Sequence, residues 1–372
     1  MVIHLVCAAR PNFMKIAPLY HALGKEEWAD PVIIHTGQHY DPNMSDAFFA
    51  DLGLPKPHVN LGVGSGSHAE QTGKVMICYE QILQDQRPDL VVVVGDVNST
   101  MAATIAAAKM GVRVAHLEAG LRSFDRTMPE EINRLVTDVL ADMLWTPSRD
   151  ADENLFREGI PHARIRMVGN IMIDSLEMLR DRIEAERTYR TFGLEERGYG
   201  VVTLHRPSNV DDPTNLKKLC GLLEEISERA PLIFPVHPRT RQKMDENHLL
   251  HDMRNSMKLF LPGPLSYVSF MNLVFNSRFV ITDSGGLQEE TSYLGIPCLT
   301  IRKNTERPIT ITHGTNQLCE ISQLKQKTLE ILLSEGRKRK HIELWDGKAA
   351  KRIVDILRDL NLKTGNANTA TK

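Results

Sequence analysis

Three carboxylates in the first half of the chain occupy positions from which they could transfer protons. Asp96 follows the apolar run at 90–94, Glu118 follows a strand pattern at 112–116, and Glu130 stands where a helical pattern begins. Open α/β sheets bind ligands at such strand ends, and carboxylates there suit acid–base chemistry. Helix capping explains one acid of this kind equally well, but the three together favour chemistry.

Two cations near the N-terminus could bind an anion. Residues 8–15 read AARPNFMK, in which a strand ends in small residues and a proline opens a helix. Arg10 and Lys15 then lie near a helix N-terminus, where their charge opposes the helix dipole. A bound anion explains this arrangement, and so do two solvated surface cations.

A histidine and a glycine pair follow strand patterns in the second half. His205, in VVTLHRPSN, could act as a general acid or contact a phosphate, although a lone histidine is more often structural. In ITDSGGLQEE, Ser284, Gly285 and Gly286 open a helix whose free N–H groups can face a diphosphate. Glu290, one turn into that helix, could accept the paired hydroxyls of a ribose.

Two further patterns are discounted. GVGSGS at 62–67 resembles a dinucleotide fingerprint, but no buried strand immediately precedes it and its spacing is not GxGxxG, so we expect a loop. Asp150 and Asp152 form a D-x-D pattern, but they follow Pro147 and Ser148 at a helix start, where acids are expected in any case.

Short apolar runs alternate with helical stretches throughout the chain, which predicts βαβ units and parallel sheets. We expect strands near 2–6, 31–35, 90–94, 112–116, 143–146, 164–168, 200–204, 232–236, 258–261, 279–282 and 298–301. We expect helices that include 13–23, 69–85, 101–109, a helix from 129, 214–228, 267–275, 286–294 and 349–360.

Length and composition favour a globular protein of two domains. The chain has 372 residues, is 42% hydrophobic and carries a net charge of -2, so we expect neither a nucleic-acid partner nor a membrane partner. Five dispersed cysteines indicate reduced thiols in the cytoplasm, and the fourteen histidines show no metal-site spacing. We place the domain boundary after Val168 and expect a disordered tail at 363–372.

The order of several motifs resembles the UDP-N-acetylglucosamine 2-epimerase family over nearly the whole chain. These motifs are ARPNFMK, GDVNST, HLEAGLRS with PEEINR, TLHRP, PVHPRT, TDSGGLQEE, GIP and TERP. The resemblance implies a GT-B-type fold, with two Rossmann-like doubly wound parallel-sheet domains and an interdomain cleft. It assigns 1–168 and a crossing helix at about 350–362 to the first domain. It assigns 169–349 to a UDP-binding domain.

The resemblance also implies roles for individual residues. Its catalytic positions match Asp96, Glu118, Glu130 and His205, and its substrate-binding positions match Arg10, Lys15, Leu265, Phe270, Ser284, Gly285, Gly286, Glu290 and Arg307. The sequence departs from many members at Asn12 and in TLHRPSN. In addition, residues 38–41 retain only the start of a segment that many bacterial members use to bind an activating second UDP-sugar.

The family chemistry needs no metal and no redox cofactor. UDP leaves C1, the C2 hydrogen becomes acidic, a 2-acetamidoglucal forms, and UDP adds back with the opposite C2 configuration. A homodimer and a role in polysaccharide biosynthesis are implied in the same way. The alternatives are a hydrolysing epimerase that releases N-acetylmannosamine, a related substrate such as a diacetamido uronic acid, a GT-B glycosyltransferase and a non-catalytic UDP-sugar sensor.

Overall fold

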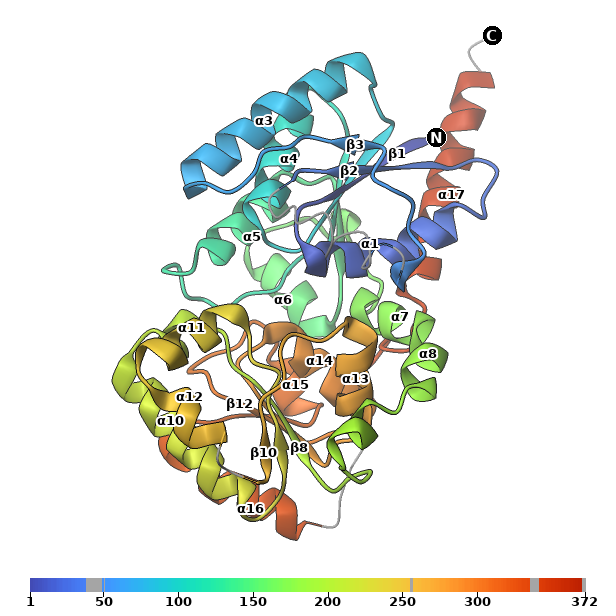
Figure 1. Cartoon of the computed structure of the whole chain (residues 1–372). Helices are drawn as coiled ribbons and strands as arrows, with labels where there is room; N and C mark the ends of the chain where they lie inside the picture. The colour runs from blue at the N-terminus through green and yellow to red at the C-terminus, as the bar shows by residue number, and fades with distance from the viewer. Residues whose placement is uncertain (38–48, 50, 255–256, 335–340, 370–372) are drawn as a thin grey trace. The chain divides into compact units, whose positions relative to one another are not determined.

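The computed structural model describes residues 1–37, 49, 51–254, 257–334 and 341–369 (Figure 1). These residues form two compact units. Unit 1 comprises Met1–Met178 together with Glu343–Lys372, and unit 2 comprises Leu179–Ile342. Each unit is built around its own parallel β-sheet.

Unit 1 has a seven-stranded sheet in the order β3-β2-β1-β4-β5-β6-β7, and all its strand pairs are parallel. Its strands are β1 (Val2–Cys7), β2 (Asp30–His35), β3 (Val59–Asn60), β4 (Leu90–Val94), β5 (Val114–Leu117), β6 (Met143–Thr146) and β7 (Ile165–Met167). The central strand β4 is buried along its whole length, which explains its unbroken run of Leu and Val.

Helices cover both faces of the unit 1 sheet. They are α1 (Arg10–Leu23), α3 (His68–Asp85), α4 (Asn98–Lys109), α5 (Pro129–Leu140), α6 (Arg149–Arg157), η1 (His162–Arg164), α7 (Ile171–Met178) and α17 (Ala349–Thr369). Helix α4 contacts α3 and α5 on one side, whereas α1 contacts α7 and α17 on the other (Figure 1). This arrangement places the start of α1 and the start of α5 at the carboxyl edge of the sheet.

Unit 2 has a six-stranded sheet in the order β10-β9-β8-β11-β12-β13, again with parallel pairs. Its strands are β8 (Gly200–Thr203), β9 (Leu232–Ile233), β10 (Leu259–Phe260), β11 (Phe279–Thr282), β12 (Cys298–Thr300) and β13 (Asn316–Leu318). Its helices are α8 (Arg180–Ala185), η2 (Thr188–Phe192), α9 (Pro207–Val210), α10 (Pro213–Ser227), α11 (Pro238–Glu246), α12 (Leu249–Arg254), α13 (Tyr267–Phe275), α14 (Gly285–Leu294), α15 (Ile309–Thr312), η3 (Ile321–Gln323) and α16 (Leu324–Leu333).

The structure confirms the predicted fold class, two doubly wound parallel-sheet α/β domains, and contains every strand expected from the sequence. The sequence missed β3 and β13 because strands of two and three residues are too short to show a pattern. Residues 62–67 lie between β3 and α3, where Ser67 and Glu70 form a capping box.

The units divide after Met178, whereas we expected the division after Val168. Helix α7 belongs to unit 1 because Ser175 Oγ donates a hydrogen bond to the carbonyl of Met14 in α1. Gly169 lies inside unit 1 at φ 92°, where a Cβ would come within 2.1 Å of the Leu344 carbonyl oxygen. Gly169 is therefore a close-packing position within one unit.

The C-terminal helix is longer than expected. Helix α17 continues to Thr369 and thus includes residues that we expected to be a disordered tail; residues 370–372 lie outside the described part. Extending an existing helix needs no new nucleus, so a polar tail can continue its hydrogen-bond pattern. Within the described ranges, no helix is long and apolar enough to cross a membrane.

Candidate active site

Lys15 and Glu118 form a buried ion pair at the carboxyl edge of the unit 1 sheet. Lys15 lies in α1, Glu118 directly follows β5, and only 8% and 4% of their surfaces are exposed. Lys15 Nζ contacts Glu118 Oε2. Gly95, after β4, lies against the pair, because a Cβ on Gly95 would come within 3.2 Å of Lys15 Nζ. Two residues predicted from separate motifs therefore meet in one place.

The backbone at Glu118 fixes the direction of its carboxylate. Glu118 has φ 72°, a left-handed conformation that is uncommon for residues other than glycine. The N–H groups of Glu118 and Ala119 both donate to the Trp145 carbonyl, at 3.1 and 3.2 Å. Gly120 follows at φ 81°, where a Cβ would lie 2.4 Å from the Ala151 carbonyl oxygen. A strained turn held by its neighbours in this way is typical of functional sites.

Asp96 lies on the loop after β4 and pairs with a residue of α5. Arg134 Nη1 contacts Asp96 Oδ2, and Asn133 Nδ2 donates to the Asp96 carbonyl at 2.8 Å. The Arg134 side chain is 2% exposed, whereas that of Asp96 is 32% exposed. A buried guanidinium therefore orients a carboxylate that remains open to a ligand.

Two adjacent acids of α5 differ in their surroundings. Glu130 is exposed in the first turn, as a residue that contacts a ligand can be. Glu131 is 2% exposed and accepts hydrogen bonds from Ser123 N and Oγ, both at 2.9 Å. It also accepts from Phe124 N at 3.0 Å and pairs with Arg134 at 2.6 Å. The sequence analysis missed Glu131, because spacing alone does not tell which glutamate of PEE turns inward.

A buried network that the sequence analysis also missed supports these turns. His116 on β5 lies with Nδ1 2.6 Å from Asp138 Oδ1 and Nε2 2.8 Å from the Gly95 carbonyl. Asp138 also accepts from Gly120 N at 3.1 Å and pairs with Arg122 at 2.7 Å. Burial acts to raise the pKa of Asp138, but His116 and Arg122 outweigh it and lower that pKa. The network joins the turn before Asp96 to the turn after Glu118.

In unit 2, the predicted glycines begin α14 directly after β11. Ser284 is the N-cap residue, and its side chain makes no capping hydrogen bond. A Cβ on Gly286 would meet nothing within 4 Å, so the space beside Gly286 is open. A Cβ on Gly285 would lie 2.6 Å from Glu306 Oε1 and 2.9 Å from Arg307 Nη1. The start of this helix thus offers backbone amides beside a guanidinium, which suits a diphosphate.

Arg307 is held by two carboxylates. Its Nε lies 2.9 Å from Glu289 Oε1, and its Nη1 lies 2.5 Å from Glu306 Oε1. Glu306 also pairs with Arg302 at 2.7 Å. Burial acts to raise the pKa of Glu306, but Arg307 and Arg302 outweigh it and keep that pKa well below its ordinary value. The family resemblance names Arg307 as a substrate-binding position but assigns no role to Glu289 and Glu306, which position it.

Glu290 is buried and hydrogen bonded to a tyrosine. Tyr267 of α13 donates its hydroxyl to Glu290 Oε1 at 2.6 Å. Burial raises the pKa of Glu290 to about 7; the hydrogen bond from Tyr267 opposes this rise, and nearby Glu289 adds to it. Leu265, just before α13, and Phe270, within α13, are partly buried.

His205 and Asp283 join the ends of the neighbouring strands β8 and β11. His205 Nδ1 lies 2.8 Å from Asp283 Oδ1, and its side chain is 42% exposed. Asp283 is fully buried and accepts from the N–H groups of His205 and Arg206 at 3.0 and 2.9 Å. Burial acts to raise the pKa of Asp283, but His205 and these N–H groups outweigh it and lower that pKa. The carboxylate therefore orients the ring of His205.

The predicted residues thus form one group in each unit. Unit 1 holds Lys15, Asp96, Glu118 and Glu130 near the carboxyl edge of its sheet; unit 2 holds His205, Leu265, Phe270, Ser284, Gly285, Gly286, Glu290 and Arg307. The side chain of Arg10 and residues 38–41 lie outside the described part of the chain. Among the described residues, no group of three or more His, Cys, Asp or Glu side chains is arranged to hold a metal ion.

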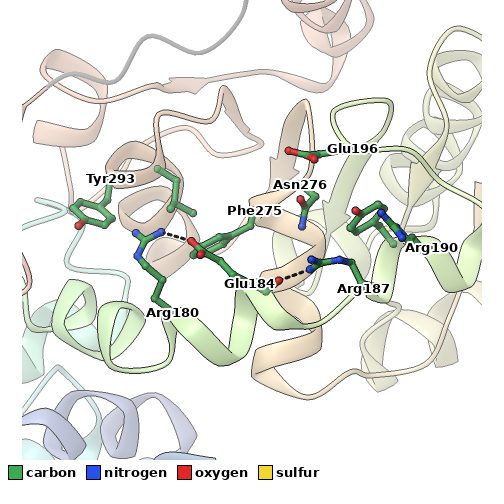
Figure 2. A pocket seen from close by; sticks show the side chains of 10 residues that line it. Arg180, Glu184, Arg187, Arg190, Glu196, Phe275, Asn276 and Tyr293 are labelled. Carbon is green, nitrogen blue, oxygen red and sulfur yellow. Dashed lines mark hydrogen bonds and ion pairs between the residues drawn. The ribbon is translucent and has the colours of Figure 1, made fainter.

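A pocket of about 460 Å³ lies elsewhere in unit 2 (Figure 2). Arg180 stacks on the Phe275 ring and pairs with Glu184 at 2.9 Å. Arg187 donates to the carbonyls of Glu184 and Glu186. These cations are engaged by the wall of the pocket itself, and the pocket is lined by none of the site residues predicted from the sequence.

Comparison with known proteins identifies the family. A family model described as UDP-N-acetylglucosamine 2-epimerase matches residues 21–358. The UDP-N-acetylglucosamine 2-epimerase of Methanocaldococcus jannaschii is 42% identical, and the match covers 96% of this chain and 99% of that protein. The UDP-2,3-diacetamido-2,3-dideoxy-D-glucuronate 2-epimerase of Pseudomonas aeruginosa is 39% identical, with 86% and 88% covered.

A solved structure agrees with these matches. The crystal structure of M. jannaschii UDP-GlcNAc 2-epimerase in complex with UDP-GlcNAc and UDP superimposes with a TM-score of 0.88. The two chains share 41% sequence identity, with 96% of this chain and 99% of that chain covered. The fold, the motifs and the family model agree, and the chain belongs to the UDP-N-acetylglucosamine 2-epimerase family.

Proposed function

We propose that this protein interconverts UDP-N-acetylglucosamine and UDP-N-acetylmannosamine by eliminating UDP and adding it back. The observation that carries the proposal is the pairing of Glu118 with Lys15 beside the Gly95 turn, next to Asp96 and its partner Arg134. This arrangement supplies two positioned carboxylates at one sheet edge, as removal and return of a C2 proton require. Family membership supplies the substrate class.

In the first step the C1–O bond breaks and UDP leaves with the bonding electrons. We assign the diphosphate to the amides of Gly285 and Gly286, with Arg10 and Arg307 supplying positive charge and His205 contacting a phosphate. Donors fixed in this way stabilise negative charge that grows on the leaving group. Arg307 suits this role because Glu289 and Glu306 hold it in place. We assign the ribose to Glu290 and the uracil to Leu265 and Phe270.

In the second step the C2 proton moves to a carboxylate and a 2-acetamidoglucal forms. Return of a proton to the opposite face of C2 and attack of UDP on C1 complete the inversion. We assign these two proton transfers to the carboxylates of Asp96, Glu118 and Glu130. Because UDP is retained and re-used, the reaction consumes no water and changes no oxidation state.

One experiment separates the proposal from its alternatives. The protein is incubated with UDP-N-acetylglucosamine alone in deuterated water, and the products are identified by NMR. We expect UDP-N-acetylmannosamine carrying deuterium at C2. Free N-acetylmannosamine with UDP would identify a hydrolysing epimerase. Turnover only with an added acceptor would identify a GT-B glycosyltransferase, and binding without turnover a UDP-sugar sensor.

The identity of the sugar needs a comparison of substrates. The P. aeruginosa diacetamido-glucuronate epimerase is nearly as similar to this chain as the M. jannaschii enzyme. We propose UDP-N-acetylglucosamine as the better substrate, because the longer match and the higher identity are to an enzyme named for it. A higher kcat/KM for the diacetamido uronic acid would contradict this choice.

The proposal extends to the assembly and the cellular location of the protein. We propose a homodimer on family resemblance, which sedimentation at several protein concentrations tests. We propose a cytoplasmic enzyme because its five cysteines are free thiols, four of them buried. We further propose that its product serves polysaccharide biosynthesis, for which deletion of the gene and analysis of surface glycans would be the test.

A further inference from the structure

We infer that Arg134 is a positioning residue for the proposed reaction: it holds the Asp96 carboxylate in the direction of the substrate without contacting the substrate itself. The inference deepens the proposed function and rests on it. It gives a role to the arginine of PEEINR, to which the sequence analysis assigned none.

The contacts of Arg134 divide between one open acid and one buried acid. Its Nη1 contacts Asp96 Oδ2. Its Nη2 lies 2.6 Å and its Nε 3.1 Å from Glu131 Oε2. Nη2 also approaches Ser123 Oγ at 3.4 Å. The planar guanidinium therefore joins the ligand edge of the sheet to the loop before α5.

Glu131 holds the guanidinium of Arg134 in place, so that Arg134 does not follow movements of Asp96. The Glu131 carboxylate accepts from Ser123 N, Ser123 Oγ and Phe124 N at 2.9, 2.9 and 3.0 Å. Burial acts to raise the pKa of Glu131, but the hydrogen bonds from Ser123 and the charge of Arg134 outweigh it and lower that pKa. A charged and fully bonded Glu131 fixes one edge of the guanidinium, so the other edge points to Asp96.

A lysine could not replace this geometry. Arginine presents several N–H donors in one rigid plane, whereas lysine carries a single ammonium on a flexible stem. Arg134 uses different nitrogens for Asp96, on the loop after β4, and for Glu131, in the first turn of α5. Lysine would retain the charge but would reach only one of the two carboxylates at a time. The two effects of Arg134, charge and aim, can therefore be separated by substitution.

The direction of the Asp96 carboxylate matters because Asp96 is more exposed to solvent than Glu118, the other ion-paired acid of the unit 1 site. Its side chain is 32% exposed, against 3% for that of Glu118. A ligand can therefore reach the Asp96 carboxylate, and its direction is set by the guanidinium behind it.

Several other polar groups surround this loop. Lys15 and Glu118 lie against Gly95, and His116 contacts the Gly95 carbonyl. His68 of α3 contacts Asn98, which in turn accepts from Asn133 beside Arg134. Each variant is therefore compared with the wild-type protein under the same conditions, so that only the change due to Arg134 is counted.

The test compares R134Q, R134K and the control R164Q. Arg164 of η1 donates to the carbonyls of Asp138, Val139 and Ala141 at the opposite end of α5, so R164Q removes a guanidinium that contacts this helix but does not contact Asp96. We expect R134Q to lower kcat about 100-fold with KM changed less than about twofold.

The conservative variant and chemical rescue separate charge from aim. We expect R134K to leave kcat reduced although it retains the positive charge, because lysine cannot hold both carboxylates at once. Millimolar guanidinium should raise kcat of R134A, which leaves a cavity at this position, and should not raise kcat of R164A. A purely structural arginine would lower kcat in R134Q and R164Q alike, and guanidinium would not restore the kcat of R134A.

A second measurement keeps the inference separate from the proposed function. Crystal structures of the wild-type protein, R134Q and R164Q show where the Asp96 carboxylate points. We expect it to leave its wild-type position in R134Q and to keep that position in R164Q, whether or not the protein turns over UDP-N-acetylglucosamine. An Asp96 carboxylate that stays in place in R134Q would overturn the inference, whereas an absence of wild-type turnover would overturn the proposed function alone.

Discussion

Tyr267 and Glu290 share a hydrogen bond of 2.6 Å between α13 and α14, and the acceptor is a buried carboxyl whose pKa lies at about 7. The bond joins the helix that carries Phe270 to the helix that begins with Gly285 and Gly286. The residues that we assign to uracil, ribose and diphosphate thus lie on two connected helices. The affinity for the nucleotide should therefore depend on whether Glu290 is protonated.

We expect affinity for UDP-N-acetylglucosamine to rise as pH increases through about 7. Below that pH Glu290 is protonated, and above it the carboxylate can accept from both ribose hydroxyls. The diphosphate of the intact sugar nucleotide is a diester at both ends and does not titrate in this range. Calorimetric titration between pH 6 and 8 measures the slope. E290Q should bind more weakly and with a flat profile; an equal slope in E290Q would contradict the assignment.

Y267F tests the cause of that pKa. The Tyr267 hydrogen bond lowers the pKa of Glu290, against burial, which raises it. Removing the hydroxyl should therefore move the midpoint of the binding profile above that of the wild-type protein. A midpoint that moved to lower pH would mean that Tyr267 does not stabilise the charged carboxylate.

The two glycines at the start of α14 should respond differently to alanine. In G285A the new Cβ would lie 2.6 Å from Glu306 Oε1, so the crowded site should lower the free energy of unfolding by about 1–3 kcal/mol. In G286A the new Cβ meets nothing within 4 Å, so stability should change little. If the diphosphate lies against Gly286, G286A should raise KM about tenfold or more. Urea unfolding and steady-state kinetics of both variants provide the comparison.

The pair of Lys15 and Glu118 should show strong coupling. K15M and E118Q each leave the charge of the other side chain buried without a counter-charge. We therefore expect each variant to lower the free energy of unfolding by about 3–5 kcal/mol. The double variant should lose less than the sum of the two, which a thermodynamic cycle from urea unfolding measures. E118Q should also lower kcat by about 100-fold or more, because a carboxamide cannot take a proton. Additive losses would show that the two side chains do not interact in solution.

Asp174 should make the stability of unit 1 depend on pH. It accepts from Ala349 N and Ala350 N at 3.1 and 2.8 Å at the start of α17, and burial raises its pKa from 3.8 to about 6. Because the folded pKa is the higher one, its contribution is complete below about pH 4 and is lost as pH rises through about 6. The change amounts to about 3 kcal/mol.

Comparison of the wild-type protein with D174N isolates this contribution. Asparagine does not ionise, so the free energy of unfolding of the wild-type protein should fall relative to that of D174N between about pH 4 and pH 6. Urea unfolding at several pH values measures the difference. A difference that stayed constant or changed in the opposite direction would show that the N–H groups of α17 outweigh burial.

The sequence predicted the strands of both sheets because buried parallel strands leave continuous apolar runs such as Leu90–Val94. It did not predict β3 or the extent of α17, because two-residue strands carry no periodicity and a polar tail gives no sign of where a helix stops. The domain assignment of α7 depended on Asp174 and Ser175, whose partners are remote in the sequence.

For the site, the sequence by itself determined which residues follow the strands: Asp96 and Glu118 in unit 1 and the Ser284–Gly286 turn in unit 2. It could do so because small residues, glycines and acids after an apolar run mark the carboxyl edge of a sheet. Only the tertiary structure decided which side chains act on each other. Arg134 with Asp96, Tyr267 with Glu290 and Asp283 with His205 are contacts between separate elements, and their strength depends on burial that no single segment encodes.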